Sequence, residues 1–396
     1  MLDSPFSPWP AYTKDEAAKV HDVILSNKVN YWTGFECRMF EQEFAKFAET
    51  KYAIALANGT VALDVGFKAL GLGAGDEVIV TSRTFIASVS SIINSGARPV
   101  FADIDQDSQN ISITTILAVL TEKTKAIVCV HLAGWPCDMD PIMQLAQEKG
   151  LYVIEDCAQA HGAKYKGRSV GSIGHLGAWS FCQDKIMTTG GEGGMVTTNE
   201  RELWSKIWSF KDHGKSWESF YEKEHPSGFR WVHDSFGTNW RMTEIQAAIG
   251  RIQIKRMTDW SAKRQANAEA IWGAARECKL LRVPDLNCEG CDSQCDTLSG
   301  CLHAAYKCYV FVNGDESLRD TIMESINNLG VPCFSGSCSE VYLEHAFDDT
   351  DYRPKERLPV AKRLGETSLM FLCHPTLTQA EIQKTCDVIR EVANSL

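Results

Sequence analysis

A lysine and an aspartate stand at the ends of two apolar runs, and together they could carry covalent chemistry. Asp156 closes the run Leu151–Asp156, and Lys185 follows a second run into the glycine-rich turn Thr188-Thr-Gly-Gly-Glu-Gly-Gly194. A carboxylate can hold a protonated pyridine nitrogen, and a partly desolvated lysine can bind an aldehyde as a Schiff base. The pair therefore indicates the chemistry of pyridoxal 5'-phosphate (PLP). Taken singly, each also has an ordinary interpretation: Asp156 caps a following helix, and Lys185 is a solvated surface charge.

Other residues could bind the phosphate and the ring of such a cofactor. Gly59 and Thr60 follow the β-rich run Tyr52–Ala57 and open a predicted helix, where backbone N–H groups and the helix dipole favour an anion. Ser180, just before the lysine turn, could add a hydroxyl group. Phe85 follows another apolar run and could place its ring against the cofactor face. A glycine between strand and helix is common, however, and Phe85 alone would be assigned to core packing.

Composition narrows the class of protein. The chain has 396 residues, of which 44% are hydrophobic and 23% charged, so it can form a large domain and a smaller one. A net charge of −11 without a dense basic block argues against nucleic acid or an anionic membrane as partner. The first ten residues lack the features of a signal peptide, and no apolar run is long enough to span a bilayer. We therefore expect a cytoplasmic protein.

The fifteen cysteines are expected to be mostly reduced thiols, because no signal peptide is expected. Several of them cluster with a histidine near the C-terminal third of the chain: Cys288, Cys291, Cys295, Cys301, His303 and Cys308. The cluster contains one C-x2-C pair, but no second pair follows at the spacing typical of structural zinc sites. Free thiols on a loop and no metal are therefore the prediction, with a zinc site as the alternative.

The order of predicted elements indicates the fold class. Between residues 50 and 200, seven β-rich runs alternate with helical stretches, and several runs are continuously apolar, as in parallel strands covered on both faces. The strands are predicted at Tyr52–Ala57, Glu77–Thr81, Pro99–Ile104, Ala126–His131, Leu151–Asp156, Ala178–Cys182 and Gly194–Thr198. This rhythm predicts an α/β fold with a doubly wound, mostly parallel sheet, and ligands bind such sheets at the carboxyl ends of the strands.

The C-terminal third is predicted to form a smaller α+β domain. Thr243 and Gln246 form a capping box that opens a long helix, and this helix is expected to continue through the charged stretch at Lys263 and Arg264. A strand is predicted at Tyr309–Val312 and a final helix from about Gln379. We place the boundary after residue 255, so that residues 1–255 form an N-terminal arm and the large cofactor-binding domain, and residues 256–396 form the small domain.

With these residues in place, the chain resembles the DegT/DnrJ/EryC1/StrS family of PLP-dependent nucleotide-sugar aminotransferases. The likeness spans nearly the whole chain and is far more specific than any single motif. It rests on Tyr31-Trp-Thr-Gly34, Phe40-Glu-Gln-Glu-Phe44, Asn58-Gly-Thr60, Gly75-Asp-Glu-Val-Ile79, Gly96-Ala97, Phe101-Ala-Asp103, His131-Leu-Ala-Gly134, the stretch from Glu155 to Ala163, the stretch from Ser180 to Gly194, and Asn239-Trp-Arg-Met242.

The resemblance implies the aspartate aminotransferase-like fold (PLP fold type I), with a mostly parallel seven-stranded sheet, and a homodimer that shares its active sites. It implies that Lys185 forms the Schiff base, that Asp156 binds the pyridine nitrogen, and that Gln159 lies near the ring hydroxyl. Phe85 takes the position of the ring-stacking aromatic residue. The resemblance further implies that the phosphate is held by Gly59, Thr60, Ser180 and Asn239 of the partner subunit.

The activity implied by the resemblance is transfer of an amino group from L-glutamate to a nucleotide-linked 4-keto-6-deoxy sugar. We favour UDP-2-acetamido-4-keto-2,6-dideoxyhexose as the substrate, for surface polysaccharide or glycan synthesis. Family members that dehydrate sugars carry histidine at the lysine position, so Lys185 favours transamination. The alternatives are a 3-keto-sugar aminotransferase and a PLP-binding regulator without turnover. The cysteine-rich insertion and the stretch Cys333–Tyr342 depart most from the family's pattern. They fall in the smaller domain, where the family places part of the sugar-nucleotide site, and so affect which sugar is expected to bind.

Overall fold

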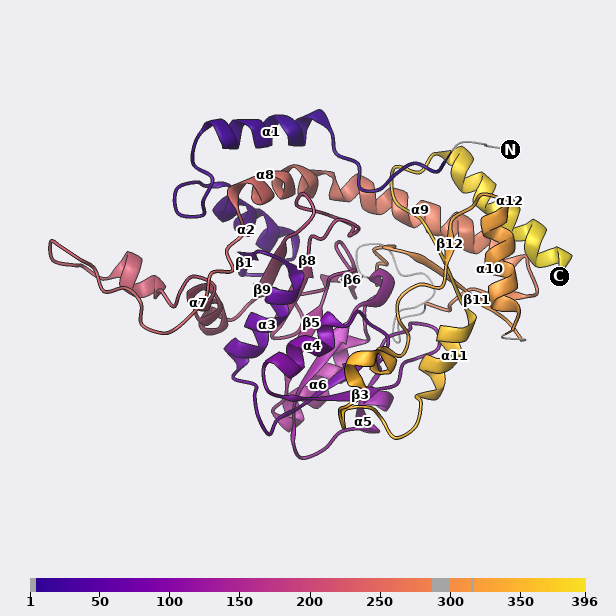
Figure 1. The fold of residues 1–396 in the computed structure, drawn as a ribbon, viewed down its shortest axis with the longest axis horizontal. Coiled ribbons are helices and arrows are strands. Elements are labelled where there is room, and N and C mark those ends of the chain that lie inside the picture. The colour runs from indigo at the N-terminus through magenta and orange to yellow at the C-terminus, as the bar shows by residue number, and fades with distance from the viewer. Residues whose placement is uncertain (1–4, 287–299, 315–316) are drawn as a thin grey trace.

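A seven-stranded mixed sheet lies at the centre of the computed structural model, which describes residues 5–286, 300–314 and 317–396 (Figure 1). The strand order is β1-β9-β8-β5-β4-β2-β3. The strands are β1 Tyr52–Leu56, β2 Glu77–Thr81, β3 Arg98–Ala102, β4 Thr124–Val130, β5 Tyr152–Asp156, β8 Leu176–Ser180 and β9 Gly194–Thr198. Strand β9 runs antiparallel to β1 and β8, and the other pairings in this sheet are parallel. The prediction of a mostly parallel sheet is confirmed.

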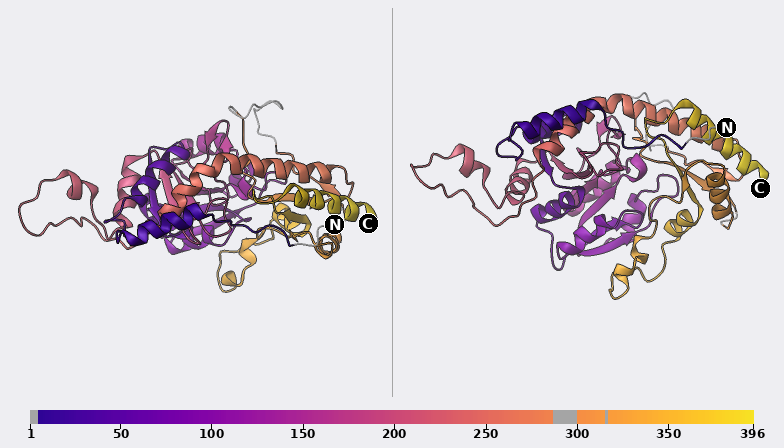
Figure 2. Two further views of the ribbon diagram at one scale, coloured as in Figure 1. Left: turned by 90° about the horizontal axis from the view of Figure 1, so that it is seen from above. Right: turned by 45° about the horizontal axis from the view of Figure 1, so that its top comes forward.

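Helices cover both faces of this sheet (Figure 2). They are α1 Lys14–Leu25, α2 Glu36–Phe47, α3 Gly59–Leu70, α4 Ala87–Asn94, α5 Ile113–Leu117, α6 Met139–Lys149, α7 Arg201–Phe210 and α8 Glu244–Gln253. Successive residues of one strand enter different cores: Ile54 and Leu56 of β1 belong to the core beneath α3, α4 and α7, whereas Ala53 and Ala55 belong to the core beneath α2. Burial on both faces explains why these runs contain so few polar residues.

A nearly continuous helical stretch leads from the large sheet to a second sheet (Figure 1). It begins at α8 with the predicted capping box, in which Thr243 Oγ1 accepts from the Gln246 N–H and the Gln246 side chain accepts from the Thr243 N–H. A 3₁₀ turn, Ile254–Arg256, connects α8 to α9, Met257–Arg276. The predicted domain boundary at residue 255 falls in this turn. It stays a prediction, because the helical stretch crosses it without a linker.

The second sheet is four-stranded and antiparallel, with the order β10-β11-β13-β12. Its strands and the helices of this region are β10 Leu281–Arg282, β11 Cys308–Val312, β12 Cys333–Phe334, β13 Ser368–Phe371, α10 Leu318–Asn328, α11 Pro359–Thr367 and α12 Gln379–Ser395. One core joins the sheet to α9, α10 and α12. The predicted final helix is confirmed. No helix in the described parts of the chain is long and apolar enough to cross a bilayer.

A long segment between α7 and α8, residues 211–240, projects from the body and is called the arm below (Figures 1 and 2). A single π-helical turn, Glu218–Glu222, interrupts an otherwise irregular path. The arm carries large aromatic side chains that are exposed in the single chain: 80% of Phe229, 74% of Trp231 and 99% of Phe236. Exposed aromatic rings in such a group are typical of a surface that another molecule covers.

Candidate active site

The predicted site residues gather where strands of the large sheet end. Asp156 is the last residue of β5 and Ser180 the last of β8, and these strands are parallel neighbours that pair Asp156 with Ala178. Gly59, the first residue of α3 after β1, packs directly on the Ser180 side chain. This edge of an α/β sheet is where ligands bind in such folds.

Two donors orient the Asp156 carboxylate, which is almost fully buried. Its Oδ2 accepts from Ser88 Oγ of α4 at 2.7 Å, and its Oδ1 accepts from the Ala158 N–H at 3.1 Å. Thr84 Oγ1 lies 2.9 Å from Ser88 Oγ, and since the Ser88 proton goes to Asp156, Thr84 must donate to Ser88. A carboxylate accepts up to about four hydrogen bonds, so Asp156 retains acceptor sites for a further donor. Sequence reasoning missed Ser88, because only the tertiary fold brings it to β5.

Gln159 and Phe85 lie on segments beside this carboxylate. Gln159 is buried, and its Oε1 accepts from the Ala133 N–H at 2.8 Å. That contact fixes the amide so that its NH₂ group is the end that can donate to a ligand. Phe85 directly follows Thr84 in the loop after β2, and its ring is 68% exposed. An exposed aromatic ring at the carboxyl edge of the sheet can stack on a planar ligand.

The start of α3 forms a concave backbone surface beside Ser180. Asn58 caps the helix, its Oδ1 accepting from the Val61 N–H at 3.0 Å, so the N–H groups of Gly59 and Thr60 remain available to a ligand. Thr60 is exposed, and Ser180 Oγ accepts from the Cys182 N–H at 3.3 Å. Backbone donors and a hydroxyl at a positive helix N-terminus suit a phosphate group.

The close contact at Gly59 gives a direct test of this surface. A Cβ on residue 59 would lie 2.6 Å from Ser180 Cβ and 3.0 Å from its Oγ. Gly59→Ala should therefore displace Ser180 or the start of α3, with a strain of about 1–3 kcal/mol. We expect weaker PLP binding when the cofactor is titrated into apoprotein. As control, Gly273→Ala in α9 meets no atom within 4 Å and should leave PLP affinity unchanged. Equal PLP affinity in both variants would contradict the assignment.

Lys185 lies in the loop after β8 and is tied to distant parts of the chain. Its carbonyl oxygen accepts from Trp9 Nε1 at 2.8 Å, and its Nζ lies 5.2 Å from the centre of the Tyr306 ring. The Tyr306 hydroxyl donates to the Asp184 carboxylate. Burial opposes ionisation of Asp184, but the Lys185 charge and the Tyr306 hydroxyl outweigh it and lower its pKa. Trp9 and Tyr306 carried no signal in the sequence.

His161 is a buried polar group to which sequence reasoning gave no role. Its ring lies beside Trp179 and Phe181, with centroid distances of 5.3 and 5.5 Å. Neither ring nitrogen has a hydrogen-bond partner among the described residues. Burial, together with the charges of Lys185 and Arg264, lowers its pKa to about 3, so the imidazole is neutral near pH 7. His161 therefore lies within the field of both cations.

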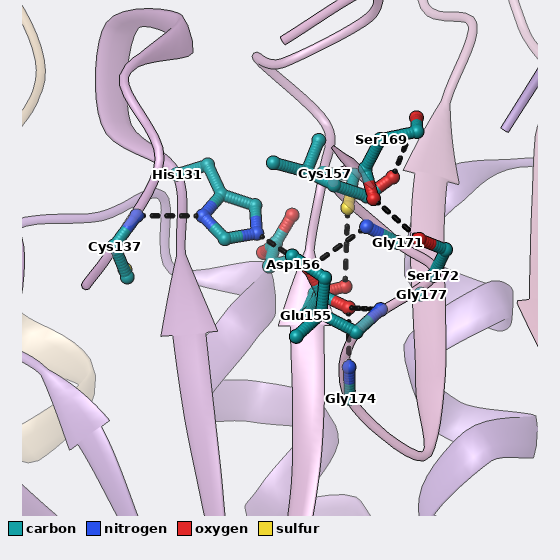
Figure 3. A network of polar contacts seen from close by, with 12 residues as sticks. His131, Cys137, Glu155, Asp156, Cys157, Ser169, Gly171, Ser172, Gly174 and Gly177 are labelled. Atoms are coloured by element: carbon teal, nitrogen blue, oxygen red, sulfur yellow. Dashed lines mark hydrogen bonds and ion pairs between the residues drawn. The ribbon is translucent and has the colours of Figure 1, made fainter. Parts of the chain in front are cut away.

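Glu155, the residue before Asp156, accepts hydrogen bonds from several buried donors (Figure 3). Glu155 is fully buried, and its carboxylate accepts from Gly171 N at 2.8 Å, Ile173 N at 2.8 Å, Gly174 N at 2.6 Å and His131 Nε2 at 3.0 Å. Burial opposes ionisation of Glu155, but these hydrogen bonds outweigh it and lower its pKa. Gly171 has a φ of 78°, and a Cβ there would collide with Trp179. Glu155 thus fixes the loop before β8 to the end of β5.

The same cluster contains three residue types that can bind metals. Ligand atoms of His131, Glu155 and Cys157 lie within 4.8 Å of one another, the single such group among the described residues. His131 Nδ1 accepts from the Cys137 N–H at 3.0 Å, so its proton is on Nε2, which donates to Glu155. Burial raises the pKa of Cys157 well above its ordinary value, which keeps it a thiol. The cluster is therefore a hydrogen-bonded support for Asp156, with its donors and acceptors already paired.

The cysteine cluster identified in the sequence falls partly outside the described residues, which contain neither Cys288 nor Cys291 nor Cys295. Cys301 Sγ accepts from the Lys166 N–H at 3.5 Å. The buried Cys308 thiol lies 3.8 Å from the Ala268 carbonyl oxygen. Within the described parts of the chain, these cysteines and His303 form no group of three ligands close enough to share one ion.

Asn239 lies at the base of the arm and is exposed in the single chain. Its backbone pairs with that of Asp212, and the carbonyl oxygen of the next residue, Trp240, accepts from the Ala57 N–H at 2.9 Å. The arm therefore starts and ends next to the strand that leads into α3. The structure brings Asp156, Ser180, Gly59 and Phe85 to one edge of the sheet, whereas the Asn239 side chain faces outward.

Comparison with known proteins agrees with this fold and site. The X-ray structure of an aminotransferase from Psychrobacter cryohalolentis is 63% identical, with a TM-score of 0.95 over 99% of each chain. GDP-perosamine synthase of Escherichia coli O157:H7 is 42% identical over 66% of this chain and 68% of its own. The UDP-N-acetyl-3-dehydro-α-D-glucosamine 3-aminotransferase of Acidithiobacillus ferrooxidans is 34% identical over 94% of each chain.

Fold and site together define an enzyme of the transaminase class. The DegT/DnrJ/EryC1/StrS aminotransferase family matches residues 10–390, and the chain belongs to this family. The fold class expected from the resemblance is confirmed, as is the family itself.

Proposed function

We propose that the protein uses PLP to transfer an amino group from L-glutamate to a nucleotide-linked 4-keto-6-deoxy sugar. The observation that carries the proposal is the meeting, at one edge of the large sheet, of a buried carboxylate with spare acceptor sites and a helix N-terminus that can hold phosphate. The family supports the class of reaction, and the relatives' names support a sugar nucleotide as substrate.

The residues at this edge fit PLP. When bound, PLP supplies an aldehyde that condenses with amines and a ring that withdraws electrons from the donor's α-carbon. Asp156 would accept a hydrogen bond from the protonated ring nitrogen. The hydroxyl groups of Thr84 and Ser88 hold the Asp156 carboxylate in place. Gly59, Thr60 and Ser180 would donate to the phosphate. Gln159 would donate to the ring hydroxyl, and Phe85 would cover one ring face.

Lys185 has two roles in this proposal. Its Nζ would hold the cofactor covalently in the resting enzyme, and its free amine would serve as the base that takes the proton from the donor α-carbon. Trp9 donates a hydrogen bond to the Lys185 carbonyl oxygen, and the Tyr306 ring lies beside Nζ, so these contacts would keep the freed amine near the proposed cofactor site. This positioning would keep Lys185 Nζ within the short distance of the donor α-carbon that proton transfer requires.

The arm supports a homodimer with shared active sites. Phe229 and Trp231 form an edge-to-face pair with ring centroids 4.3 Å apart, and both rings are mostly exposed in the single chain. A second copy of the chain would cover these rings, and it would bring Asn239 of the partner subunit to the phosphate. A monomer in solution at micromolar concentration would contradict this part of the proposal.

The position of the new amine separates the proposal from its closest alternative. The relative from Acidithiobacillus ferrooxidans is named as a 3-aminotransferase, which favours a 3-keto sugar as the second candidate. For this chain we propose C4 of UDP-2-acetamido-4-keto-2,6-dideoxyhexose. The product would serve the synthesis of a surface polysaccharide or glycan.

A panel of keto-sugars tests the proposal. The purified protein is mixed with L-glutamate, 2-oxoglutarate is measured, and UDP-, GDP- and dTDP-linked 3-keto and 4-keto sugars are then compared by kcat/KM. We expect the highest value for the UDP-linked 4-keto sugar, with the amine at C4 by NMR. An amine at C3 would support the alternative. No 2-oxoglutarate from glutamate would contradict the amino donor and favour a regulator without turnover, whereas 2-oxoglutarate without product from any sugar would contradict the proposed sugar.

A further inference from the structure

A cavity of about 320 Å³ lies beside the Lys185 loop and is not used by the residues assigned so far. Trp9, Asp184 and Tyr306 line it and connect it to Lys185, since Trp9 donates to the Lys185 carbonyl oxygen and the Tyr306 ring lies under Lys185 Nζ. Two further cations line it from the second sheet's side, Arg264 of α9 and Lys307 just before β11. We call this space the Arg264 cavity.

Arg264 is a buried charge that has no carboxylate partner within the described parts of the chain. It is 1% exposed, and its guanidinium carbon lies 4.8 Å from the centre of a Trp9 ring. Its Nη1 reaches only the carbonyl oxygens of Ala305 and Tyr306, each at 3.4 Å. Its Nε and Nη2 have no hydrogen-bond partner among the described residues. A guanidinium buried in this way is costly unless an anion accompanies it.

Lys307 adds a second cation that can reach the cavity directly. Its Nζ lies 5.0 Å from the centre of the Tyr306 ring, the ring that Lys185 also contacts, and the side chain is only half-buried. Within the described residues it forms no ion pair with a carboxylate. Burial lowers the pKa of Lys307, and together with the charges of Arg264 and Lys185 it outweighs the opposing effect of Asp184, so that the pKa stays below its ordinary value. Lys307 is therefore a cation that Asp184 balances only in part.

The charges and walls of the cavity select the kind of anion. Asp184 is the single carboxylate among the described lining residues, and it already accepts from the Tyr306 hydroxyl. Arg264 and Lys307 therefore leave about one positive charge over, which suits one carboxylate better than a doubly charged diphosphate. The rings of Trp9 and Tyr306 provide apolar walls for the methylene groups that would precede such a carboxylate.

We propose that the Arg264 cavity binds the side-chain carboxylate of a dicarboxylic amino donor. Lys307 contacts the carboxylate directly, and the positive charge of Arg264, which lies against the Trp9 ring, attracts the carboxylate electrostatically. The inference rests on the proposed function and deepens it: in glutamate the side-chain carboxyl carbon is four bonds from the amine that must reach the Lys185 position. The cavity would thus explain why a dicarboxylate, and not an amino acid with a short apolar side chain, serves as donor.

Binding of glutarate to the holoenzyme tests the proposal, because glutarate has both carboxylates and no amine. Calorimetry is carried out on the wild type, on Lys307→Met, which keeps the length of the side chain, and on Lys263→Met. Lys263 is the exposed neighbour of Arg264 on α9 and serves as the matched control. We expect Lys307→Met to weaken glutarate binding about tenfold or more, since it removes a charge-assisted contact, and Lys263→Met to have no effect. The KM for glutamate should rise by a similar factor at nearly constant kcat.

Three outcomes would overturn the proposal. The first is that the wild type binds no glutarate at millimolar concentration, and the second is that both variants bind it equally well. The third is that Lys307→Met weakens binding of UDP but not of glutarate, which would assign the cavity to the diphosphate of the nucleotide. Glutarate cannot be transaminated, so its binding is independent of the keto-sugar assay. A negative sugar panel with positive glutarate binding would contradict the proposed sugar alone.

Discussion

Lys185→Ala should abolish turnover and leave a folded protein. The substitution removes both the covalent attachment point and the base proposed for proton transfer, so we expect a loss of at least about 10³-fold in kcat. The long-wavelength absorbance of lysine-bound PLP should disappear at the same time. Lys185 is only half-buried and its ammonium forms no ion pair within the described chain, so the unfolding temperature should change little.

A second lysine variant serves as control for this result. Lys149, exposed at the end of α6, is replaced by alanine and should retain wild-type turnover and absorbance. Far-ultraviolet circular dichroism and thermal unfolding of both variants separate loss of chemistry from loss of fold. If Lys185→Ala turned over glutamate at the rate of Lys149→Ala, the assignment of Lys185 would be wrong.

Glu155→Gln should destabilise the fold strongly although it changes one atom. The carboxylate accepts from three backbone N–H groups and from His131 Nε2 (Figure 3), and the amide NH₂ of glutamine would face some of these donors. Unpaired buried donors and a lost charge-assisted network cost about 3–5 kcal/mol in the free energy of unfolding. Urea unfolding at pH 7 measures this. The exposed Glu148→Gln on α6 is the control and should stay within about 0.5 kcal/mol of wild type.

The pH dependence of this effect follows from the pKa of Glu155. Its pKa is lowered in the folded protein, so the ionised carboxylate stabilises the fold at pH values above the unfolded pKa of about 4.3. That stabilisation is lost as the pH falls through the lowered, folded value. The difference between wild type and Glu155→Gln should therefore be constant from pH 6 to 8 and shrink in acid. A difference that stayed the same at the lowest pH still permitting folding would contradict the role of the charge.

Local signals made much of the fold predictable. The apolar run ending in Asp156 is β5, and the Thr243–Gln246 pair caps α8, because period and capping depend on residues close in sequence. The family motifs added the class of enzyme. The carboxyl-edge location of Asp156 and Ser180 followed from their places in predicted parallel strands, since parallel strands end at the same edge.

Long-range contacts were not predictable in the same way. Arg264 belongs to a stretch that reads as charged helix surface, yet it is fully buried, because Trp9 from the N-terminal segment covers it. Nothing in the sequence around Glu155 predicts that the loop after β7, Arg168–Ser169, will donate hydrogen bonds to its carboxylate. Such groups are placed by the packing of segments far apart in the chain, which periodicity does not encode.

The antiparallel strand β9 has a consequence for how the protein forms. Among the described strands, β1 pairs with β9 alone, so Tyr52–Leu56 can join the sheet only after Gly194–Thr198 has been synthesised. Pairings of such wide sequence separation form slowly, because a long loop must close before they stabilise anything. Until then, the apolar strand β1 is unpaired, and the contact between Gly59 and Ser180 has not formed. The corner between Gly59 and Ser180, where we propose that the phosphate binds, is thus expected to be assembled late, so that cofactor binding would follow closure of the sheet.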